Sequence, residues 1–485
     1  MGLTLAEALR LGRDRPSGVA IAFVGAGGKS TAMFQLARQL PAPVLVTTTT
    51  HLGTWQAALV DEHIVVVGAE HVDAGPSKAN PEYIFTVVTY LAGAQTSLAE
   101  ERFVLPPEEY PGKMKLTGVT LVTGPSVVDD RLSEPPAASL RWLHDIARRD
   151  RLPLLIEADG AHQKPLKAPA EHEPAMPPGL DIVVVVAGLQ GLGKPLSSAY
   201  VHRVNEFASV SSVNLGRPIT PDGLVRVLKH PQAGGLKHVS EGIGRVVLLN
   251  QADTDELRAQ ARGMAVPLLQ SYDAVIVASL GHSEVHAVHE HVAGIVLAAG
   301  SSQRLGRPKQ LLDWRGQPFV RAVAETALKA GLSPVVVVIG SNAGEVEAAV
   351  HGLPVQIAQN DAWQTGQASS IRAGVQALPP RAGGVVFLLA DQPQVKFEVI
   401  TALVNTHATG LHAIVAPLVM MEQRANPVLF DRATFHDLLG LEGDVGGRAV
   451  FSKHRVEYMP WHDDRLLLDV DTEEDYRRLV EDDTL

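Results

Sequence analysis

The chain has 485 residues, more than one hydrophobic core usually serves, so we expect two large domains. Hydrophobic residues make up 46% and charged residues 20%, the balance of a fully folding chain rather than a disordered one. The formal net charge of -11, without a long run of Lys and Arg, argues against nucleic-acid and membrane partners. The lack of cysteine excludes disulfides, thiolate metal ligands and a cysteine nucleophile, and favours a reducing cytoplasm.

The first residues indicate a short helix rather than an export signal. Thr4 and Glu7 have the spacing of a capping box. The stretch lacks the basic flank and the long apolar core of a signal peptide, so we expect no export. The longest aliphatic run, residues 182–189, is far shorter than the roughly 20 residues of a membrane helix and is better explained as a buried strand.

Short runs rich in Val, Ile and Leu alternate with helical stretches, which is typical of parallel strands in an α/β fold. The runs of the first part are residues 19–24, 44–46, 154–156, 182–186 and 246–249. A second series comprises residues 294–300, 335–339, 385–389 and 414–416. The sequence therefore predicts two α/β domains, which we place at residues 1–285 and 293–485.

A histidine-rich stretch, residues 282–291, lies where the two series meet. Histidines at this density can bind metal. We interpret the stretch instead as the domain junction, with a solvated linker at residues 286–292 and the histidines on a surface helix.

A glycine loop follows the first predicted strand and precedes a helical stretch, residues 32–40. Phosphate loops need flexible glycines, a lysine for the β- and γ-phosphates and a hydroxyl for Mg²⁺ at the start of a helix. All three are present, although the first glycine stands two places later than in the standard pattern, and a plain turn is the alternative. The residues that we expect to bind phosphate are Gly25, Gly27, Gly28, Lys29, Ser30 and Thr31.

Two polar segments further along could complete this site. Glu157 and Asp159 end an apolar strand, where a carboxylate could hold Mg²⁺ directly or through water, so Asp159 and Ser30 are candidate metal ligands. Residues 246–253 resemble the Asn-Lys-x-Asp base-reading motif of GTPases, but Gln251 stands where the lysine belongs. A strand followed by a polar turn explains that segment equally well, so ATP and GTP both remain open.

Residues 157–174, together with residues 47–51 and the glycine loop, resemble the YqeC family, and the likeness extends over most of residues 1–280. The resemblance implies an accessory role in the maturation of selenium-dependent molybdenum hydroxylases, while the residues themselves imply a P-loop-like nucleotide-binding domain. A metal or substrate site is conceivable among the histidines and acids of these segments, although each alone is better explained as a loop or core residue. These residues are His51, His162, His172, Glu171 and Glu173.

The second series of strands opens with a loop that could hold a triphosphate. Residues 298–309 contain two glycines, several small residues and the cations Arg304, Arg307 and Lys309. Such a loop lets amide groups approach phosphate, while the cations offset charge on a leaving pyrophosphate. On glycine content alone, an ordinary strand-to-helix turn would serve equally well.

Two acidic groups follow this loop. Asp391 ends an apolar strand at the edge where α/β proteins bind ligands, and we expect it to bind Mg²⁺. Asp469 and Asp471 are two residues apart, hence on one side of an extended segment, and could share an oxygen-coordinated ion. Taken alone, Asp471 or Thr472 would more often cap a helix.

These motifs, with residues 363–374, 424–430 and 443–448, resemble the MobA-like nucleotidyltransferases and, within them, the MocA type of molybdenum cofactor cytidylyltransferase. The resemblance implies a Rossmann-like fold and Mg²⁺-dependent transfer of CMP from CTP to the terminal phosphate of molybdopterin cofactor, with release of pyrophosphate and no protein nucleophile. It assigns catalysis to Arg304, Lys309 and Asp391, and the metal to Asp391, Asp469 and Asp471. The residues assigned to the nucleotide are Leu297, Ala298, Ala299, Gly300, Ser301, Arg304, Lys309, Gly366, Ser369 and Ser370. Those assigned to the acceptor side are Arg424, Asn426, Gly446 and Arg448.

Several alternatives remain open within this interpretation. The Ala298-Ala299 pair favours the cytidylyl over the guanylyl type, but Ala425 stands where the family pattern has glycine, which leaves the acceptor open. GTP could be the donor, the acceptor could be another phosphorylated molecule, and the first domain could be a non-catalytic cofactor carrier. An inactive second domain is disfavoured by the intact Lys309, Asp391 and Asp471. We therefore predict a cytoplasmic fusion protein of cofactor maturation that contacts a molybdenum hydroxylase transiently.

Overall fold

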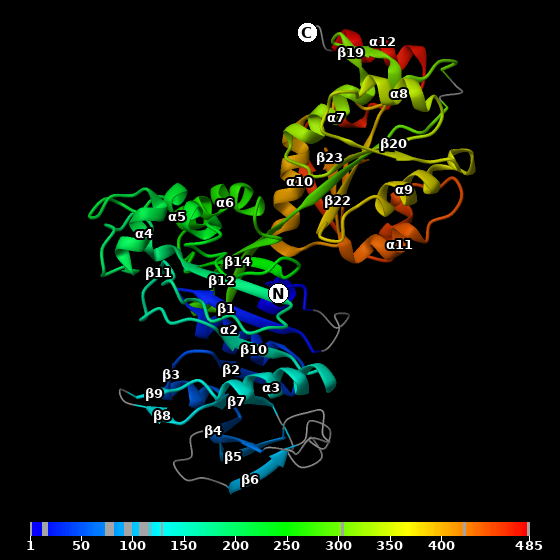
Figure 1. The fold of residues 1–485 in the computed structure, drawn as a ribbon. Coiled ribbons are helices and arrows are strands. Elements are labelled where there is room, and N and C mark those ends of the chain that lie inside the picture. The colour runs from blue at the N-terminus through cyan, green and yellow to red at the C-terminus, as the bar shows by residue number, and fades with distance from the viewer. Residues whose placement is uncertain are drawn as a thin grey trace. The chain divides into compact units, whose positions relative to one another are not determined.

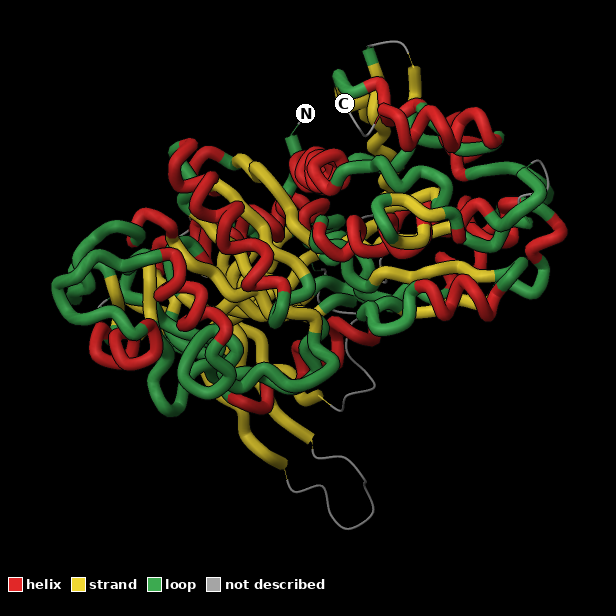
Figure 2. Tube along the Cα trace, turned by 90° about the horizontal axis from the view of Figure 1, so that it is seen from above, coloured by secondary structure: helices red, strands yellow, loops and turns green. Residues whose placement is uncertain are grey.

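The computed structural model describes residues 2–11, 18–72, 82–91, 99–105, 116, 118–127, 130–301, 305–420 and 423–482. The chain divides into two compact units, Met1–Val288 and His289–Leu485. In each unit the strands lie between helices (Figures 1 and 2). The predicted α/β class is confirmed for both units.

The first unit is built on one long sheet. Its described strands have the order β16-β15-β14-β12-β1-β10-β2-β7-β4-β5-β6, and the pairing is parallel from β15 through to β4. Their bounds are β1 Ala20–Gly25, β2 Val44–Thr48, β4 Glu62–Val72, β5 Glu82–Leu91, β6 Ala99–Leu105, β7 Val119–Thr123, β10 Leu154–Glu157, β12 Ile182–Gly188, β14 Gly244–Asn250, β15 Ala274–Ser279 and β16 Glu284–Glu290. All five runs predicted for this part are strands, and their side chains are almost wholly buried.

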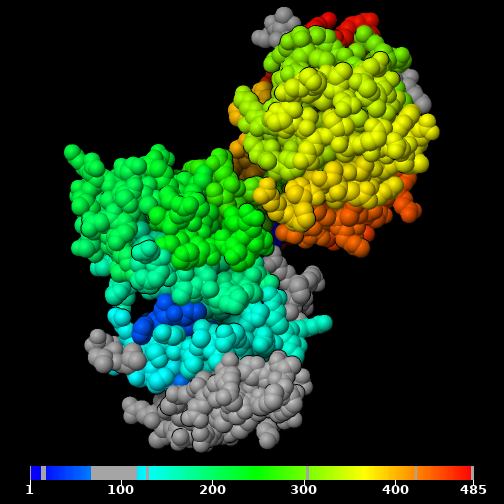
Figure 3. Space-filling model, in the orientation of Figure 1, coloured from blue at the N-terminus to red at the C-terminus, as the bar shows by residue number. Residues whose placement is uncertain are grey.

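Helices and short elements complete the first unit. The helices are α1 Leu5–Ala8, α2 Lys29–Gln39, α3 Ala137–Arg149, α4 Val204–Ser211, α5 Pro221–Lys229 and α6 Asp255–Leu269, with 3-10 turns at Thr54–Leu59, Leu189–Gly191 and Leu280–His282. The short strands are β3 Leu52–Gly53, β8 Ser126–Val127, β9 Arg131–Leu132, β11 Leu166–Lys167 and β13 Val201–His202. The predicted capping box is confirmed, since the Thr4 side chain accepts from the amide of Glu7 and Glu7 accepts from the amide of Thr4. Helix α5 packs against both α4 and α6, and the three helices contribute to the surface drawn in green in Figure 3.

The histidine-rich stretch is the one segment where the predicted element was wrong. Residues Glu284–Glu290 form strand β16 at the edge of the first sheet, not a surface helix, and β17 begins two residues later at Val292. Val285 and Val288 are β-branched and suit an extended backbone, and His286 Nε2 lies 2.9 Å from Ser279 Oγ on the preceding segment. The polar composition suggested a linker at 286–292, but residues up to Glu290 pair with β15 as a strand instead.

The second unit is built on a mixed sheet of order β21-β20-β17-β22-β25-β23-β24, with β26 beside β23. The bounds are β17 Val292–Leu297, β18 Asp313–Trp314, β19 Gln317–Pro318, β20 Val335–Ile339, β21 Gln356–Gln359, β22 Gly384–Leu389, β23 Ile414–Val419, β24 Gln423–Arg424, β25 Val428–Asp431 and β26 Val456–Trp461. The four runs predicted here are strands. β17 lies between β20 and β22 and is parallel to both, so their carboxyl ends meet at one edge.

Two cores cover the two faces of this second sheet. Val296 and Val337 belong to one core, Ile295 and Val336 to the other, because successive residues of a strand point to opposite faces. Helices α7 Phe319–Lys329, α8 Ala343–Ala349 and α10 Phe397–Gly410 pack into the first core, and α9 Gln367–Gln376 and α11 Phe435–Leu439 into the second. The remaining helical elements are α12 Glu473–Asp482 and 3-10 turns at Lys309–Leu311, Trp363–Thr365, Arg432–Thr434, Gly447–Ser452 and Asp464–Leu467.

Candidate functional site

A cavity of about 920 Å³ opens in the second unit at the carboxyl ends of β17 and β22. Ligands of open α/β sheets bind at this edge, because the loops that follow neighbouring parallel strands meet there. The predicted residues that line it are Leu297, Ala298, Ala299, Gly300, Ser301, Lys309, Gly366, Ser370, Asp391 and Asp471. Arg304, predicted to be catalytic, lies outside the described residues. The sequence prediction missed other lining residues, which include Gln310, Trp363, Gln364, Thr365, Gln367 and Asp444.

Lys309 binds two of the predicted carboxylates. Its Nζ lies 2.5 Å from Asp391 Oδ2 and 2.7 Å from Asp471 Oδ1. Burial would lower the pKa of the Lys309 ammonium, but the neighbouring Asp391 and Asp471 raise it above its ordinary value. Lys309 is therefore a fixed cation at the floor of the cavity, where it could offset charge on phosphate.

The third predicted carboxylate lies behind the first two. Gln392 Nε2 donates to Asp469 Oδ1 over 2.5 Å, and Asp469 does not line the cavity. Burial raises the pKa of Asp469, and repulsion from Asp391 and Asp471 raises it further. The three carboxylates therefore interact electrostatically. Among the described residues, no three Asp, Glu or His side chains stand ready as a set of metal ligands.

Asp391 has the chemistry of a hard-metal ligand. Its Oδ1 is buried and accepts no hydrogen bond within the described part of the chain, although a buried carboxylate oxygen normally has a partner. Carboxylate oxygens are the ligands that Mg²⁺ prefers. Asp391 and Asp471 therefore supply two carboxylates of the kind that a divalent cation prefers, while both contact Lys309 and the described residues add no third acidic or histidine ligand.

The structure separates the two roles that the sequence left open at the start of α12. Thr472 caps the helix, because its Oγ1 accepts from the Asp475 amide and Asp475 Oδ2 accepts from the Thr472 amide. Asp471 is left facing Lys309. The capping prediction is therefore confirmed for Thr472, whereas the metal-ligand role of Asp471 stays a prediction.

The predicted serines are positioned by a residue that the sequence analysis missed. Asn360 Nδ2 lies 2.9 Å from both Ser369 Oγ and Ser370 Oγ, and Asn360 is buried. Ser370 reaches the cavity wall, whereas Ser369 turns back to the carbonyl of Gly366. Gly366 itself has φ +112°, and a Cβ there would stand 2.5 Å from the Gly443 carbonyl oxygen. Glycine is therefore required at this turn.

The residues predicted for the acceptor side lie away from the cavity wall. Arg448 Nη2 donates to the carbonyl of Arg424, and the Arg424 guanidinium lies over the rings of Tyr458 and Phe451. Ala425 is buried in the core rather than exposed to a ligand. Neither Asn426 nor Gly446 lines the cavity. The acceptor assignment stays a prediction.

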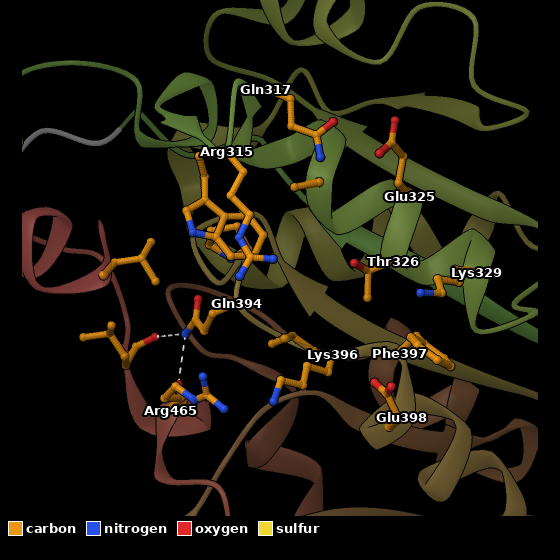
Figure 4. Close-up of a pocket in the computed structure, with 16 residues that line it drawn as sticks. Arg315, Gln317, Glu325, Thr326, Lys329, Gln394, Lys396, Phe397, Glu398 and Arg465 are labelled. Atoms are coloured by element: carbon orange, nitrogen blue, oxygen red, sulfur yellow. Dashed lines mark hydrogen bonds between the residues drawn. The ribbon is translucent and has the colours of Figure 1, made fainter. Parts of the chain in front are cut away.

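A second cavity of about 410 Å³ lies between α7 and the start of α10 (Figure 4). None of the predicted site residues lines it. Its side chains already contact one another: Gln394 donates to the carbonyls of Arg465 and Leu468, and Lys329 Nζ lies 4.1 Å from the centre of the Phe397 ring. We therefore place the phosphate chemistry in the larger cavity.

In the first unit the glycine loop joins β1 to α2, as predicted. Gly27 has φ +83°, and a Cβ there would stand 2.4 Å from the Gly188 nitrogen, so the loop passes directly over the end of β12. The first helical residue is Lys29, and the amides of a first helical turn have no partner inside the helix. The phosphate-binding role of the loop stays a prediction, and the cavity beside it, about 30 Å³, has room for little more than water.

The lysine and serine of this loop contact the acids of β10. Lys29 Nζ donates to the Gly25 carbonyl at 2.8 Å and lies 3.2 Å from Asp159 Oδ1, while Ser30 Oγ donates to Glu157 Oε2 at 2.7 Å. Burial would lower the pKa of Lys29, but Asp159 and Glu157 raise it, so the ammonium stays charged. Burial raises the pKa of Glu157, and Lys29 and Ser30 only partly offset this.

A chain of ion pairs continues from Asp159 through Lys167 and Arg203, which the sequence analysis did not select, and through Glu173, which it did. Lys167 Nζ lies 2.9 Å from Asp159 Oδ2 and 2.8 Å from Glu173 Oε2, and Arg203 holds the other side of Glu173 with contacts of 2.5 and 2.8 Å. Burial would raise the pKa of Glu173, but hydrogen bonds from Arg203 and Lys167 lower it to about 2. Glu173 is thus an ion-pair residue and not a spare metal ligand.

The other residues of the conceivable histidine site do not assemble. The His162 ring lies against the His202 ring, with ring centres 4.5 Å apart and planes tilted by 34°, whereas His51, His172 and Glu171 are exposed. Burial, then repulsion from Arg203 and from His162, lower the pKa of His202 to about 4. The described residues of this unit contain no cluster suited to a metal ion.

Comparison with known proteins divides the chain in the same way. The family model described as YqeC protein matches residues 21–205, and that of the MobA-like NTP transferase domain matches residues 294–458. Nicotine blue oxidoreductase of Paenarthrobacter nicotinovorans is 34% identical over 200 residues, which are 39% of this chain and 96% of that protein. Uncharacterized protein YqeC of Escherichia coli is 29% identical over 54% of this chain and 86% of its own length. Purine catabolism protein PucB of Bacillus subtilis is 31% identical over 38% of this chain and 94% of its own length.

Throughout the described ranges, no helix combines the length and the apolar character needed to cross a bilayer.

Proposed function

We propose that the second unit transfers CMP from CTP to the terminal phosphate of molybdopterin cofactor. The chain belongs to the YqeC family through its first unit and to the MobA-like NTP transferases through its second. The first unit would bind ATP or GTP and assist this maturation step. The proposal includes a cytoplasmic location and a transient contact with the molybdenum hydroxylase that receives the cofactor.

The observation that carries the transferase proposal is the position of Lys309 between Asp391 and Asp471 in the large cavity. A triphosphate needs cations along its chain and a loop of small residues that lets backbone amides approach. Lys309 supplies the cation, and residues 298–301 supply the loop. A cavity of about 920 Å³ is at the upper end of the range for small-molecule sites, so a nucleotide with part of an acceptor would fit.

The reaction requires no protein nucleophile. An oxygen of the acceptor's terminal phosphate would attack the α-phosphorus of CTP, the bond to the β-phosphate would break, and pyrophosphate would leave. Lys309 would bind the phosphate chain and offset the charge that develops on pyrophosphate. A divalent cation held by Asp391 and Asp471 would supply further charge neutralisation when bound. Gly366 and Ser370, on the far wall, would position the nucleoside.

The preference for CTP rests on the motif resemblance. Ala298 and Ala299, the pair that favours the cytidylyl type, are buried and line the cavity. GTP as donor, or another phosphorylated acceptor, remains the nearest alternative within the same chemistry.

The first-unit proposal rests on the geometry of the glycine loop. Lys29 and Ser30 lie at the start of α2, within contact distance of Glu157 at the end of β10 and of Asp159 just after it. A phosphate group above the first turn of α2 could receive amide hydrogen bonds and the Lys29 ammonium, and Ser30 and Asp159 stand where a Mg²⁺ ligand is expected. A non-catalytic cofactor carrier would use the same loop for a phosphate of the cofactor.

Pyrophosphate release by the purified chain tests the transferase proposal. CTP, GTP and ATP are compared side by side with Mg²⁺ and molybdenum-loaded pterin cofactor, and each is repeated without the cofactor. Release that needs both CTP and cofactor supports the proposal; release selective for GTP keeps the mechanism but moves the donor to guanine. No release with any nucleotide would contradict it and would turn attention to the oxidoreductase activity in the name of the Paenarthrobacter relative.

A further inference from the structure

The segments that follow five neighbouring strands of the first unit emerge at one edge of its sheet. Strands β10, β1, β12, β14 and β15 are consecutive neighbours and parallel, so the segments after each of them emerge at their common carboxyl end. The glycine loop follows β1, Glu157 ends β10 with Asp159 two residues beyond it, and Asn250 ends β14. The turn after β15 begins at Leu280.

Asn250 ties three of these segments together. Its Nδ2 donates to the Gly27 carbonyl at 2.8 Å, and its Oδ1 accepts from the Leu280 amide at 2.9 Å. The residue is only 3% exposed, and Gln35 of α2 adds a hydrogen bond to the Leu280 carbonyl. A plain polar turn after β14 would not need a buried amide that clamps the phosphate loop to the turn after β15. The sequence segment that was equally well explained as a turn is thus part of a built site.

The geometry also fixes the direction in which a nucleotide would lie, if the glycine loop binds phosphate as proposed above. Ser30 and Lys29 contact the acids of β10, so the terminal phosphates and a metal belong on that side of β1. The nucleoside must then extend to the opposite side, across β12 towards β14 and β15. The first carboxylate beyond Asn250 on that route is Asp253, since Gln251 is turned onto Gly188.

Asp253 is held with one oxygen and open with the other. Gln190, in the turn after β12, donates from Nε2 to Asp253 Oδ2 at 2.9 Å. Within the described part of the chain, no donor is within hydrogen-bonding distance of Oδ1, and the residue is partly exposed. A carboxylate only accepts hydrogen bonds, so it suits a base edge that carries two donors. Guanine offers N1–H and the 2-amino group side by side, whereas adenine offers a bare N1 acceptor there and would face the carboxylate unfavourably.

We propose that the first unit binds guanine nucleotides selectively, with Asp253 reading the N1 and 2-amino edge of guanine and Asn250 joining this base site to the phosphate loop. The proposal rests on the nucleotide-binding role proposed for the glycine loop and narrows it from ATP or GTP to GTP and GDP. Gln251, in place of the usual lysine of such motifs, lies against Gly188, and its Oε1 has no hydrogen-bond partner among the described residues. The base reading therefore depends on Asp253 rather than on residue 251.

Equilibrium dialysis of the full chain with GDP, ADP and XDP tests the proposal. The second unit could also bind nucleotides, so the signal of the first unit is defined as the binding that Lys29→Ala removes. Within that component GDP should bind at least about 100-fold more tightly than ADP, because a site built around hydrogen bonds strongly rejects an analogue that lacks them.

The Asp253→Asn variant tests the base contact through a gain of affinity for a different nucleotide, XDP. Asparagine keeps one acceptor and adds one donor, which matches xanthine, whose position 2 carries an oxygen instead of an amino group. The variant should lose about 10-fold or more in GDP affinity and gain a similar factor for XDP. Asp255→Asn is the matched control, since Asp255 is fully exposed two residues away and should leave both affinities unchanged.

The outcomes separate the two levels of the proposal. Equal GDP and ADP binding in the Lys29-dependent component would overturn guanine selectivity while leaving the nucleotide site in place. No Lys29-dependent binding of any nucleotide would overturn the role of the glycine loop itself. A switch from GDP to XDP in Asp253→Asn would support both levels at once and would also show that the variant is folded.

Discussion

Lys309 Nζ lies 2.5 Å from Asp391 Oδ2, and this contact joins the loop after β17 to the end of β22. Asp471 approaches the same ammonium from a third segment, at 2.7 Å. One cation thus stands between two carboxylates at the floor of the large cavity. Without the Lys309 ammonium, the two carboxylates would repel each other in a partly buried place. The charge of Lys309 therefore contributes to the stability of the fold around the site.

Lys309→Met should separate these two roles of the lysine. Loss of the cation should lower turnover by about 10²- to 10³-fold, the usual cost of removing one charge-stabilising group. The unpaired carboxylates should lower the free energy of unfolding by about 1–3 kcal/mol, and Mg²⁺ should then raise the melting temperature of the variant more than that of the wild type. Pyrophosphate release and thermal melting with and without Mg²⁺ measure both effects.

The contrasting change is Asp391→Asn, which removes charge from the acid and leaves Lys309 in place. It should abolish most turnover while the chain stays folded, with no added response to Mg²⁺. Asp464→Asn, an exposed acid of the same unit, is the control. Full activity in Asp391→Asn would show that the metal assignment is wrong.

Two glycines of the cavity should respond differently to alanine. A Cβ at Gly300 meets nothing within 4 Å, so Gly300→Ala should change stability by less than about 0.5 kcal/mol and yet raise the KM for the nucleotide, if amides here approach phosphate. Gly366→Ala should destabilise the unit by about 1–3 kcal/mol, because its φ of +112° and the nearby Gly443 carbonyl leave no room. Urea unfolding and steady-state kinetics on both variants test this, and an unchanged KM in Gly300→Ala would place the phosphates elsewhere.

The fold was largely predictable because its central strands are continuous runs of β-branched residues. Residues 182–186 and 335–339 are buried on both faces, and no other element suits such short apolar runs between helices. The strands from Glu62 to Leu105 were missed, because their sequence mixes polar and apolar residues and they pair antiparallel beyond the parallel part of the sheet. The histidine-rich β16 was missed for a related reason, since partner strands rather than composition decide its structure.

The site was predictable where one segment carries its own chemistry. Residue type and spacing are enough to identify the glycine loops, Lys309, Asp391 and Asp471 in the sequence. The local sequence does not mark three further residues, because each acquires its role only through a contact that the fold creates. These contacts are Asn360 with Ser369, Gln392 with Asp469 and Arg203 with Glu173. The choice between Asp471 and Thr472 as helix cap likewise needed the contact with Lys309.

Lys29→Ala tests whether the two units work independently. The change removes the ammonium that lies 3.2 Å from Asp159, while Lys167 still pairs with that acid, so we expect a destabilisation of the first unit of about 1–3 kcal/mol. Nucleotide binding by the first unit should fall at least about 10-fold, and pyrophosphate release by the second unit should stay unchanged. Lys194→Ala, an exposed lysine of the same unit, is the control. A parallel fall in pyrophosphate release would mean that the first unit regulates the second.

Glu173 should make the stability of the first unit depend on pH. Hydrogen bonds from Arg203 and Lys167 outweigh burial and lower its pKa from the ordinary 4.5 to about 2. A folded pKa below the unfolded one means that the ionised pair stabilises the fold above about pH 4.5, and that this contribution is lost as the pH falls from 4.5 towards 2. Glu173→Gln should therefore lower the local stability by about 1–3 kcal/mol at pH 7 and by much less at pH 3.

A whole-chain melt would mix the two units, so the measurement has to be local to the segment around Glu173. Hydrogen exchange of peptides covering residues 154–175, corrected for intrinsic rates at pH 7 and pH 3, reports the opening of this segment in the wild type and in Glu173→Gln. Arg203→Gln removes one of the two donors and should lie between them at pH 7. If wild type and Glu173→Gln differed equally at both pH values, the stabilisation would come from packing and not from the ionised carboxylate.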